Sequence, residues 1–557
     1  MPENILVAVA WPYANGSLHL GHIAGAYLPA DIFARYHRLK GNNVIMVSGS
    51  DEHGTPITLR AEQEGISPAE VATKYHREFL ESWQKLGITF DLFTTTDTEN
   101  HAAVTHDIFL RLLEKGYIYK DSMAQAYCPN CKRSLPDRYV EGKCPNCGFE
   151  GARGDQCDQC GRTLNPSDLI NVHCRTCGAT PNFEMSEHFF LKLSAFEEQL
   201  RQWVGAKTEW RQNVQNFTMA FLEGGLKDRA ITRDIEWGVT VPLPGYEKKR
   251  IYVWFEAVIG YLSASKEWAA QHGNKDGWKP YWTGENKAFY FIGKDNIPFH
   301  TIIWPAMLMG YGDLNLPYDV PANEFLTIEG KKLSTSRNWA VWLPEYLERY
   351  DPDPLRYYLS INMPETGDAD FSWHEFLRKN NDELVATYGN LVNRVLTFTN
   401  RNFNAAVPDP GELDEVSKGL LQKARNTLND VDRKLYRCHF KEALKLSMAL
   451  AQDVNRYLDD TAPWKMIKQD RQAAGRSVYT AIGAISALKT LLYPFLPFTS
   501  QKLHNFLGFE GDIREAGWSL QLPLAGQKLP LPQALFVKLE DKIVEEEVAR
   551  MKGGGVS

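Results

Sequence analysis

The sequence lacks the features that would assign the chain to a membrane or to the secretory pathway. Its longest apolar run, Ile302 to Met309, is less than half of the roughly 20 residues that a membrane-spanning helix needs. The N-terminus, MPENILVAVAWPYANG, has no cationic start, and its short apolar stretch ends in turn residues. This fits a first buried strand better than a secretory signal. We therefore expect a cytoplasmic protein with no membrane partner.

An excess of positive charge is also missing, because the formal net charge is -7 at pH 7. Any nucleic-acid partner must then be bound by lysines and arginines gathered on one surface, since phosphate affinity depends on local charge. The 557 residues, of which 43% are hydrophobic and 24% are charged, have a globular composition. A chain of this length is expected to form about three to five domains.

Disulfide bonds are not expected, although the chain has nine cysteines. Without a secretion signal, paired cysteines favour metal ligation, and two Cys-x-x-Cys pairs supply the four thiolates of a tetrahedral structural zinc site. A redox role would need a single pair in a strand–helix unit. One or two zinc ions are possible, His173 is an alternative ligand, and the unpaired Cys438 is expected to be buried and inert. The paired residues are Cys128/Cys131, Cys144/Cys147, Cys157/Cys160 and Cys174/Cys177.

The hydrophobic pattern predicts two kinds of architecture. Residues 5–9 and 44–47 read as strands on either side of a helix over 22–40 that ends at Gly41. This order implies a right-handed parallel unit and a doubly wound, Rossmann-like α/β sheet, with ligands beyond the carboxyl ends of its strands. The runs Ile251–Phe255 and Ala288–Ile292 read as strands that resume the sheet after the cysteine-rich insertion.

From about residue 380 the pattern becomes helical. Apolar residues recur at spacings of three, four and seven, which predicts amphipathic helices packed as a bundle. The last stretch, LEDKIVEEEVARMKGGGVS, reads as a charged helix with a glycine-rich end. The apolar faces consist of Leu421, Leu428, Val431 and Leu435, and of Ala443, Leu446, Leu450, Val454 and Tyr457.

Two short motifs carry the chemistry. His19 and His22 share one face at a predicted helix start, where backbone N–H groups favour an anion, and Gly21 between them leaves room for a flat ring. Lys332-Leu-Ser-Thr-Ser336 has the composition of a mobile loop that closes on a triphosphate. Taken singly, the first could be two surface histidines near a cap and the second a solvated loop.

Together, and in this order, the two motifs resemble the HIGH and KMSKS signatures of the class I aminoacyl-tRNA synthetases. The resemblance implies that His19, His22 and Lys332 act on the triphosphate of ATP, which enters with Mg²⁺. Thr335 stands where the family pattern has its second lysine, so Lys331, Arg337 or Arg233 is expected to assist Lys332. The other implied ATP-binding residues are Asn15, Gly21, Gly293, Asp295, Lys331, Ser334, Thr335 and Ser336.

Several further segments resemble the methionyl-tRNA synthetases within that class. Asp51, in Gly-Ser-Asp-Glu-His-Gly, matches the carboxylate that pairs with the substrate ammonium. A thioether suits an aromatic pocket, since each sulfur–ring contact contributes roughly 0.3–1.5 kcal/mol. Val258 and Asn296 depart from the family pattern in the pocket wall. The implied methionine-binding residues are Ala10, Trp11, Tyr13, Asp51, Trp254, Tyr261 and His300.

The same resemblance extends to the insertion and to the helical region. It implies a nested pairing, with one zinc bound by the inner four cysteines and another by the outer four. The segment Asn455 to Trp464 resembles the anticodon-reading segment, where an aromatic ring after a proline stacks on an unpaired base. The implied anticodon-binding residues are Asn393, Arg401, Pro463 and Trp464.

The resemblance therefore predicts a methionine–tRNA ligase whose partners are ATP, methionine and tRNA(Met), the initiator included. A monomer is expected, because the chain ends without an additional C-terminal tRNA-binding module. The expected segments are the catalytic domain (1–117 and 228–322), a connective insertion with zinc knuckles (118–227), a KMSKS-like loop and stem-contact region (323–380), a helical-bundle anticodon-binding domain (381–510) and a C-terminal tail and helix (511–557).

Two alternatives are left open by the sequence. A synthetase for isoleucine, valine or leucine would share the two signatures, but those relatives carry a much larger editing insertion. A non-catalytic tRNA-binding or zinc scaffold protein would not need His19, His22, Asp51 and Lys332 together.

Overall fold

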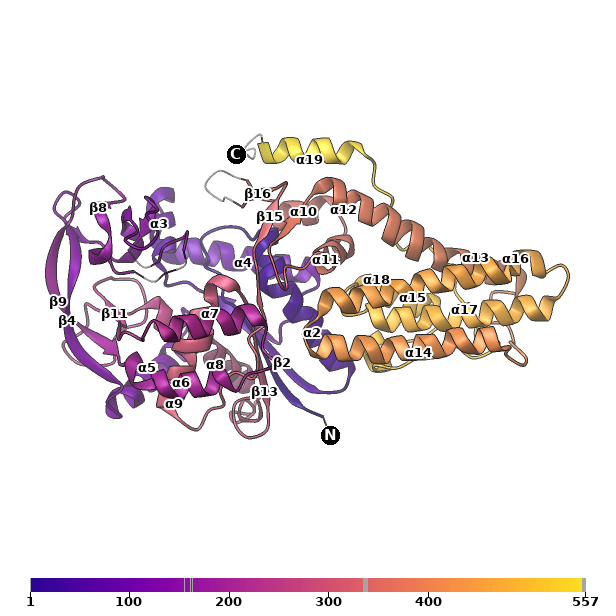
Figure 1. Cartoon of the computed structure of the whole chain (residues 1–557), viewed down its shortest axis with the longest axis horizontal. Coiled ribbons are helices and arrows are strands. Elements are labelled where there is room, and N and C mark those ends of the chain that lie inside the picture. The colour runs from indigo at the N-terminus through magenta and orange to yellow at the C-terminus, as the bar shows by residue number, and fades with distance from the viewer. Residues whose placement is uncertain (1, 155, 161, 163, 334–338, 553–557) are drawn as a thin grey trace.

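The computed structural model describes residues 2–154, 156–160, 162, 164–333 and 339–552. A part made of helices and sheets lies on one side of the molecule, and a bundle of long helices lies on the other (Figure 1). No helix in the described ranges is long and apolar enough to cross a membrane.

A five-stranded parallel sheet forms the centre of the first part. Its strand order is β3–β2–β1–β13–β14, and every neighbouring pair is parallel. The predicted doubly wound α/β fold is thereby confirmed. The strands are β1 (Asn4–Val9), β2 (Asn43–Ser50), β3 (Leu92–Thr95), β13 (Lys287–Gly293) and β14 (Ala322–Asn323).

Strand β1 separates two hydrophobic cores. Side chains alternate along a strand, so Ile5, Val7 and Val9 enter one core while Leu6 and Ala8 enter the other. Both faces of the sheet are therefore covered by helices, which is the arrangement expected of a parallel sheet. The first core contains residues of α2 (Leu28–Leu39), α3 (Thr55–Glu64) and α4 (Pro68–Leu86), and the second contains residues of α5 (Glu99–Glu114), α8 (Val253–Gln271) and α9 (Trp304–Tyr311).

The helix expected over 22–40 is built from three consecutive pieces. These are α1 (Leu20–His22), the π-helical turn η1 (Ile23–Tyr27) and α2, which ends just before Gly41 with its positive φ of 80°. The strand expected at Ile251–Phe255 is wrong. Only Arg250–Ile251 (β12) is extended, paired with Thr232–Arg233 (β11), and α8 begins at Val253. A short apolar run does not distinguish a buried strand from a buried helix start.

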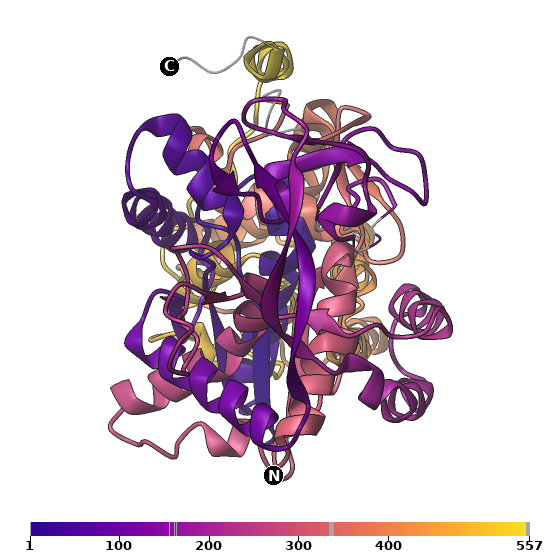
Figure 2. The same ribbon diagram turned by 90° about the vertical axis from the view of Figure 1, so that its left-hand side faces the viewer.

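The cysteine-rich insertion lies at the end of the molecule opposite the helical bundle (Figure 1). Its frame is the long antiparallel ribbon of β4 (Ile118–Cys128) and β9 (Asn182–Leu191), which crosses the face turned to the viewer in Figure 2. Smaller elements complete the region. They are β5 (Arg133–Ser134), β6 (Val140–Lys143), β7 (Ala152–Arg153), β8 (Ile170–Cys174), β10 (Arg229–Ala230), α6 (Glu197–Gly205) and α7 (Gln212–Glu223).

A small three-stranded sheet and two helices connect the central sheet to the bundle. The sheet order is β16–β15–β17, made of Lys331–Lys332 (β16), Leu326–Ile328 (β15) and Ala369–Phe371 (β17). The two helices are α10 (Leu343–Arg349) and α11 (Pro352–Ile361). β16 carries Lys332 of the predicted triphosphate loop, so this connector includes part of the predicted nucleotide site.

The second part is the predicted helical bundle. The apolar residues expected on its inner faces are buried, except that Leu446 is only partly covered. The C-terminal helix α19 (Lys542–Lys552) returns to lie beside α12 (Figure 1). The helices are α12 (Trp373–Lys379), the π-helical η9 (Asn380–Gly389), α13 (Asn390–Asn402), α14 (Glu415–Tyr436), α15 (Phe440–Thr461), α16 (Pro463–Met466), α17 (Arg471–Leu492) and α18 (Pro497–Phe506).

Candidate functional site

A cleft of about 770 Å³ opens beyond the carboxyl ends of β1, β2 and β13. This is the edge at which open parallel sheets bind their ligands. The predicted residues that line it are Ala10, Trp11, Tyr13, His19, Gly21, His22, Asp51, Trp254, Tyr261, Gly293, Asp295, His300 and Lys332. Stretches far apart in the chain are thus brought to one cavity.

The two histidines form the start of helix α1. The His19 ring is the N-cap, and its Nδ1 accepts from Gly21 N–H at 3.1 Å, while His19 N–H donates to His22 Nδ1 at 3.2 Å. The rings stack with their centroids 3.8 Å apart and an interplanar angle of 18°. Two imidazoles are therefore fixed side by side at the wall of the cleft.

Both imidazoles are neutral at physiological pH. Burial lowers the pKa of His22 to about 4, and burial together with the neighbouring His22 holds the pKa of His19 well below its usual value. Because each Nδ1 accepts a backbone N–H, the ring proton sits on Nε2. Each ring thus offers an Nε2–H donor to a ligand.

The segments around the lysine motif are attached to the histidine motif. His19 pairs with Trp342 in an antiparallel bridge, Leu20 N–H donates to Val341 O at 3.2 Å, and Leu343 N–H donates to Leu18 O at 2.8 Å. These contacts bring the lysine segment to the histidine helix, which is the spatial arrangement that the sequence predicts.

Lys332 is exposed and lies 5.9 Å from the centroid of the Phe325 ring, facing the cleft. Other predicted nucleotide residues lie elsewhere. Lys331 stacks over Trp339 and Arg233 stacks over Tyr252, and neither they nor Asn15 are among the residues that line the cleft. The predictions for Ser334, Thr335, Ser336 and Arg337 fall outside the described residues.

Asp51 is a buried carboxylate directed at the same cleft. It follows β2, its N–H donates to Pro12 O at 2.8 Å, and its carbonyl accepts from Ala14 N–H at 3.0 Å. Its side-chain Oδ1 has no hydrogen-bond partner within the described part of the chain, and the residue is 4% exposed. Burial and the nearby Glu256 raise the pKa of Asp51. Burying a carboxylate without a partner costs free energy, and a cation that entered the cleft and paired with Asp51 would remove that cost.

Aromatic side chains surround Asp51. Trp11 fits between Gly49 and Gly260, because a Cβ on either glycine would come within 2.7 Å of the indole ring. Tyr261 donates its hydroxyl to His300 Nε2 at 2.7 Å, and His300 Nδ1 bonds to the carbonyl of Asn296 at 2.9 Å. Together these rings line an apolar pocket in which Tyr261 and His300 are hydrogen-bonded, while the buried Trp11 Nε1 has no partner within the described part of the chain.

Two residues of the insertion also line the cleft and were not predicted. Arg138 lies 6.0 Å from the Tyr13 ring, and Gln156 is the neighbour of Cys157. No local sequence signal marks them, because their approach depends on how the insertion folds back over the sheet.

The eight paired cysteines gather into two clusters of four. Within each cluster the sulfur atoms lie within 4.8 Å of one another, and His173 belongs to neither. The closest sulfur pairs are 3.5 to 3.9 Å apart, close to the spacing of about 3.8 Å across a tetrahedral zinc–thiolate centre. The clusters can therefore hold zinc. They are Cys128/Cys131/Cys174/Cys177 and Cys144/Cys147/Cys157/Cys160, the nested pairing.

At the far end of the bundle, Trp464 sits one residue after Pro463, at the start of α16. The Arg394 guanidinium lies over its ring at 4.9 Å and donates to Asn455 Oδ1 at 3.0 Å. Asn393 and Arg401 are exposed on α13, the helix that also carries Arg394. The structure thus brings an aromatic plane and an arginine from separate helices together.

Comparison with known proteins adds independent evidence. Residues 5–396 match the family model described as tRNA synthetases class I (M), and residues 407–555 match the one described as the anticodon binding domain of methionyl tRNA ligase. Together the two models cover nearly all of the chain.

Individual relatives are similar over their full length. A methionine–tRNA ligase of Dehalococcoides mccartyi is 63% identical over 99% of this chain and 100% of the relative, and one of Thermomicrobium roseum is 53% identical over 99% of each. Among solved structures, Mycobacterium tuberculosis methionyl-tRNA synthetase in complex with methionyl-adenylate is 26% identical. It superposes with a TM-score of 0.80, covering 96% of this chain and 99% of that one.

Proposed function

The chain belongs to the class I tRNA synthetases specific for methionine, the methionine–tRNA ligases, and we propose how its residues divide the two steps of that reaction. In the first step the methionine carboxylate attacks the α-phosphate of MgATP, and methionyl-adenylate and pyrophosphate form. In the second step a terminal ribose hydroxyl of tRNA(Met) attacks the adenylate carbonyl, and AMP leaves.

The observation that carries the proposal is the single cleft shared by His19, His22, Asp51 and Lys332. The neutral imidazoles donate from Nε2 to phosphate oxygens, and Lys332 neutralises charge on the departing pyrophosphate. Mg²⁺ that enters with ATP neutralises further phosphate charge. Positioning and charge stabilisation are sufficient for this chemistry, so no covalent nucleophile is needed.

Methionine is selected at the aromatic end of the cleft. Asp51 pairs with the substrate ammonium, which supplies the hydrogen-bonding partner that its buried Oδ1 does not find among the described residues. The thioether lies among Trp11, Trp254 and Tyr261, where sulfur–ring contacts are favourable. An aliphatic side chain loses these contacts.

Two further roles belong to the parts outside the cleft. Each cysteine cluster would hold one structural zinc ion through its four thiolates, and with every ligand position supplied by protein neither ion would bind substrate. Trp464 and Arg394 at the bundle end stack on unpaired anticodon bases of tRNA(Met), initiator and elongator alike.

Pyrophosphate exchange run separately with each of the twenty amino acids tests this assignment. Methionine should support exchange far better than isoleucine, valine or leucine, and both initiator and elongator tRNA(Met) should be charged. Exchange that depends on one of the aliphatic amino acids instead would contradict the methionine assignment. An absence of exchange with every amino acid would contradict the catalytic assignment.

A further inference from the structure

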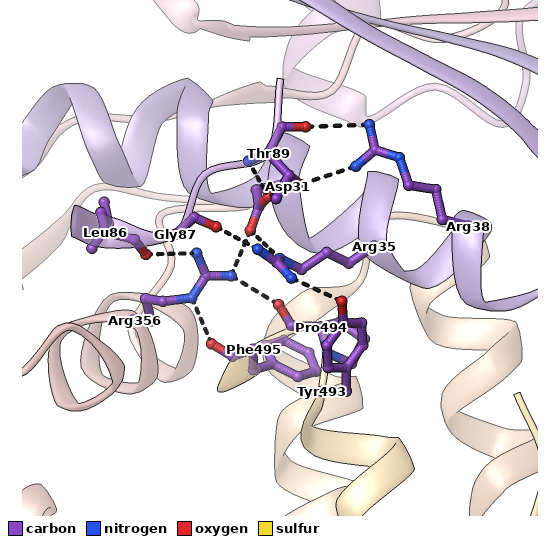
Figure 3. A network of polar contacts seen from close by, with 10 residues as sticks. All are labelled: Asp31, Arg35, Arg38, Leu86, Gly87, Thr89, Arg356, Tyr493, Pro494 and Phe495. Carbon is purple, nitrogen blue, oxygen red and sulfur yellow. Dashed lines mark hydrogen bonds and ion pairs between the residues drawn. The ribbon is translucent and has the colours of Figure 1, made fainter. Parts of the chain in front are cut away.

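A buried ionic cluster lies where the catalytic part meets the bundle (Figure 3). Figure 3 shows three of its charged members, Asp31 and Arg35 on α2 and Arg356 on α11; the fourth is Asp353, also on α11, which the figure does not draw. Asp31 and Arg356 are completely buried, while Asp353 and Arg35 are 3% and 7% exposed. None of the four lies in the cleft lining, so the reaction steps above leave the cluster without a role.

Arg356 holds the end of α17 from one side. Its Nε donates to Phe495 O at 2.8 Å, and its Nη2 donates to Pro494 O at 2.9 Å and to Asp31 Oδ2 at 2.6 Å. These carbonyls belong to the corner between α17 and α18, where the dipole of α17 presents its negative end. A guanidinium is the side chain that can reach several acceptors in fixed directions.

Asp353 holds the start of α18. It precedes Arg356 by three residues, so both side chains are on one face of α11, and its Oδ2 accepts from Thr499 N–H at 2.7 Å. The N-terminus of α18 is the positive end of that helix dipole. One face of α11 therefore places a cation at a helix C-terminus and an anion at a helix N-terminus on the two sides of the same corner.

The opposite side of the cluster is anchored in the catalytic part. Arg35 donates from Nε to Asp31 Oδ2 at 2.8 Å, from Nη2 to Gly87 O at 2.5 Å and from Nη1 to the Tyr493 hydroxyl at 3.0 Å. Arg356 Nη1 donates to Leu86 O at 3.3 Å. The end of α4 is thus bound by the same two arginines that bind the α17–α18 corner, as the dashed lines in Figure 3 show.

The cluster is connected along the chain to both motifs of the cleft. Asp31 lies on the continuous helical segment α1–η1–α2, whose first turn carries the histidine motif. Helix α11 comes after the segment that carries Lys332. A change in the angle of the corner would therefore change how the bundle sits against both motifs. The helix that carries the histidines, the segment that follows Lys332 and the bundle all meet at these few side chains.

Stability alone does not account for such a cluster. A buried ion pair loses hydration on folding, and apolar side chains of similar volume often stabilise a core equally well or better. Apolar contacts, however, allow packed elements to slide and rotate, whereas directed bonds to named carbonyl and amide groups define one orientation. Geometry is the property that the cluster supplies and apolar packing does not.

We propose that Asp353 and Arg356 are positioning residues that hold the α17–α18 corner, and with it the tRNA-reading bundle, at the orientation in which a bound tRNA presents its 3′ end to the cleft. The proposal depends on the proposed function, because it assumes that the bundle binds tRNA and that the cleft forms the adenylate. Adenylate formation needs no tRNA, so the two steps of the reaction separate the two ideas.

The test substitutes Arg356→Lys and Arg356→Met in the full chain. Lysine keeps the charge and the pairing with Asp31 but lacks the planar set of donors that reaches the carbonyls at the corner. The matched control is Arg111→Lys on α5, away from the bundle, which alters a solvent-accessible ion pair between Arg111 and Asp313. Three quantities are measured well below the unfolding temperature: methionine-dependent pyrophosphate exchange, KM for tRNA(Met) and kcat of charging.

In Arg356→Lys, the rate of exchange and the KM for tRNA should stay within about twofold of wild type. The kcat of charging should fall about tenfold, because a misplacement of the reacting tRNA end by about 1 Å can lower the rate up to a hundredfold. Arg356→Met should show the same separation more strongly, and Arg111→Lys should show none. If Arg356→Met fails to fold, Arg356→Lys decides the question alone.

Unchanged charging in Arg356→Lys would overturn the proposal, and so would an equal loss of exchange and charging, which would indicate damage to the cleft itself. A lower unfolding temperature with normal kinetics would assign the cluster to stability only. If the wild-type chain shows no exchange at all, the proposed function fails, and this inference fails with it.

Discussion

Gly21 and Leu333, which lie far apart in the sequence, touch each other in the fold. A Cβ on Gly21 would lie 2.6 Å from Leu333 Cδ1 and 3.0 Å from the His19 ring. Leu333 directly follows Lys332, and Gly21 lies between the two histidines. The histidine and lysine motifs are therefore in direct contact, and a methyl group added at Gly21 would meet both the Leu333 side chain and the His19 ring.

The first prediction concerns this contact. Gly21→Ala should lower kcat of pyrophosphate exchange about tenfold, because the methyl group displaces Leu333 and moves Lys332 away from the phosphates. Gly16→Ala is the matched control, since nothing lies within 4 Å of the Cβ added there. The double variant Gly21→Ala/Leu333→Ala should recover part of the loss. A normal rate in Gly21→Ala would mean that the contact is not needed.

The second prediction concerns Asp51. Asp51→Asn should raise the KM for methionine roughly 10- to 100-fold, because hydrogen bonds to charged groups contribute about 1.5–3 kcal/mol. The same variant should unfold at a higher temperature, since it removes a buried carboxylate that lacks a partner in the described chain. Asp313→Asn, at an 86% exposed side chain, is the control. A lower unfolding temperature with an unchanged KM would contradict both parts.

The third prediction concerns zinc. The cysteines Cys128, Cys144, Cys157 and Cys174 are buried in a small core of their own, and a core of that size needs metal to stay folded. Elemental analysis of protein purified without chelators should find two zinc ions per chain, and Cys144→Ala should reduce the content to about one by emptying one tetrahedral site. Less than one zinc per chain in the wild type would contradict the assignment.

The fourth prediction concerns pH. The pKa of His22 is about 4 in the folded chain and about 6.5 when unfolded, so only the unfolded state takes up this proton between those values. The free energy of unfolding should fall as the pH drops through this window, with a contribution from His22 of about 2 kcal/mol at pH 5. Urea unfolding of wild type and His22→Asn at pH 7.5 and pH 5 measures the difference. Equal acid sensitivity of the two chains would contradict a neutral, half-buried imidazole at His22.

The sequence could predict the central sheet and the positions of its motifs because those signals are local. Alternation along residues 5–9 and the spacing of His19 and His22 are set by strand and helix geometry alone. The strand predicted for Ile251–Phe255 is wrong, because its apolar residues fit a buried helix start equally well.

Other features depend on contacts between distant segments, and no local pattern marks them. Arg138 and Gln156 reach the cleft only because the insertion folds back over the sheet. Asp31 and Arg356 look like solvent-facing charges in their own helices, yet both are fully buried against each other. Charge alone therefore does not reveal which polar residues are buried.

The most direct test of the central claim, that the histidine and lysine motifs act on one triphosphate, is pyrophosphate exchange by Lys332→Ala at saturating methionine and ATP. In this variant kcat should fall roughly 100- to 1,000-fold with the unfolding temperature unchanged, which is the cost typical of removing one group that stabilises transition-state charge. Lys279→Ala, which changes an exposed lysine paired with Asp276, should exchange normally. Near-normal exchange by Lys332→Ala would contradict a triphosphate site shared by the two motifs.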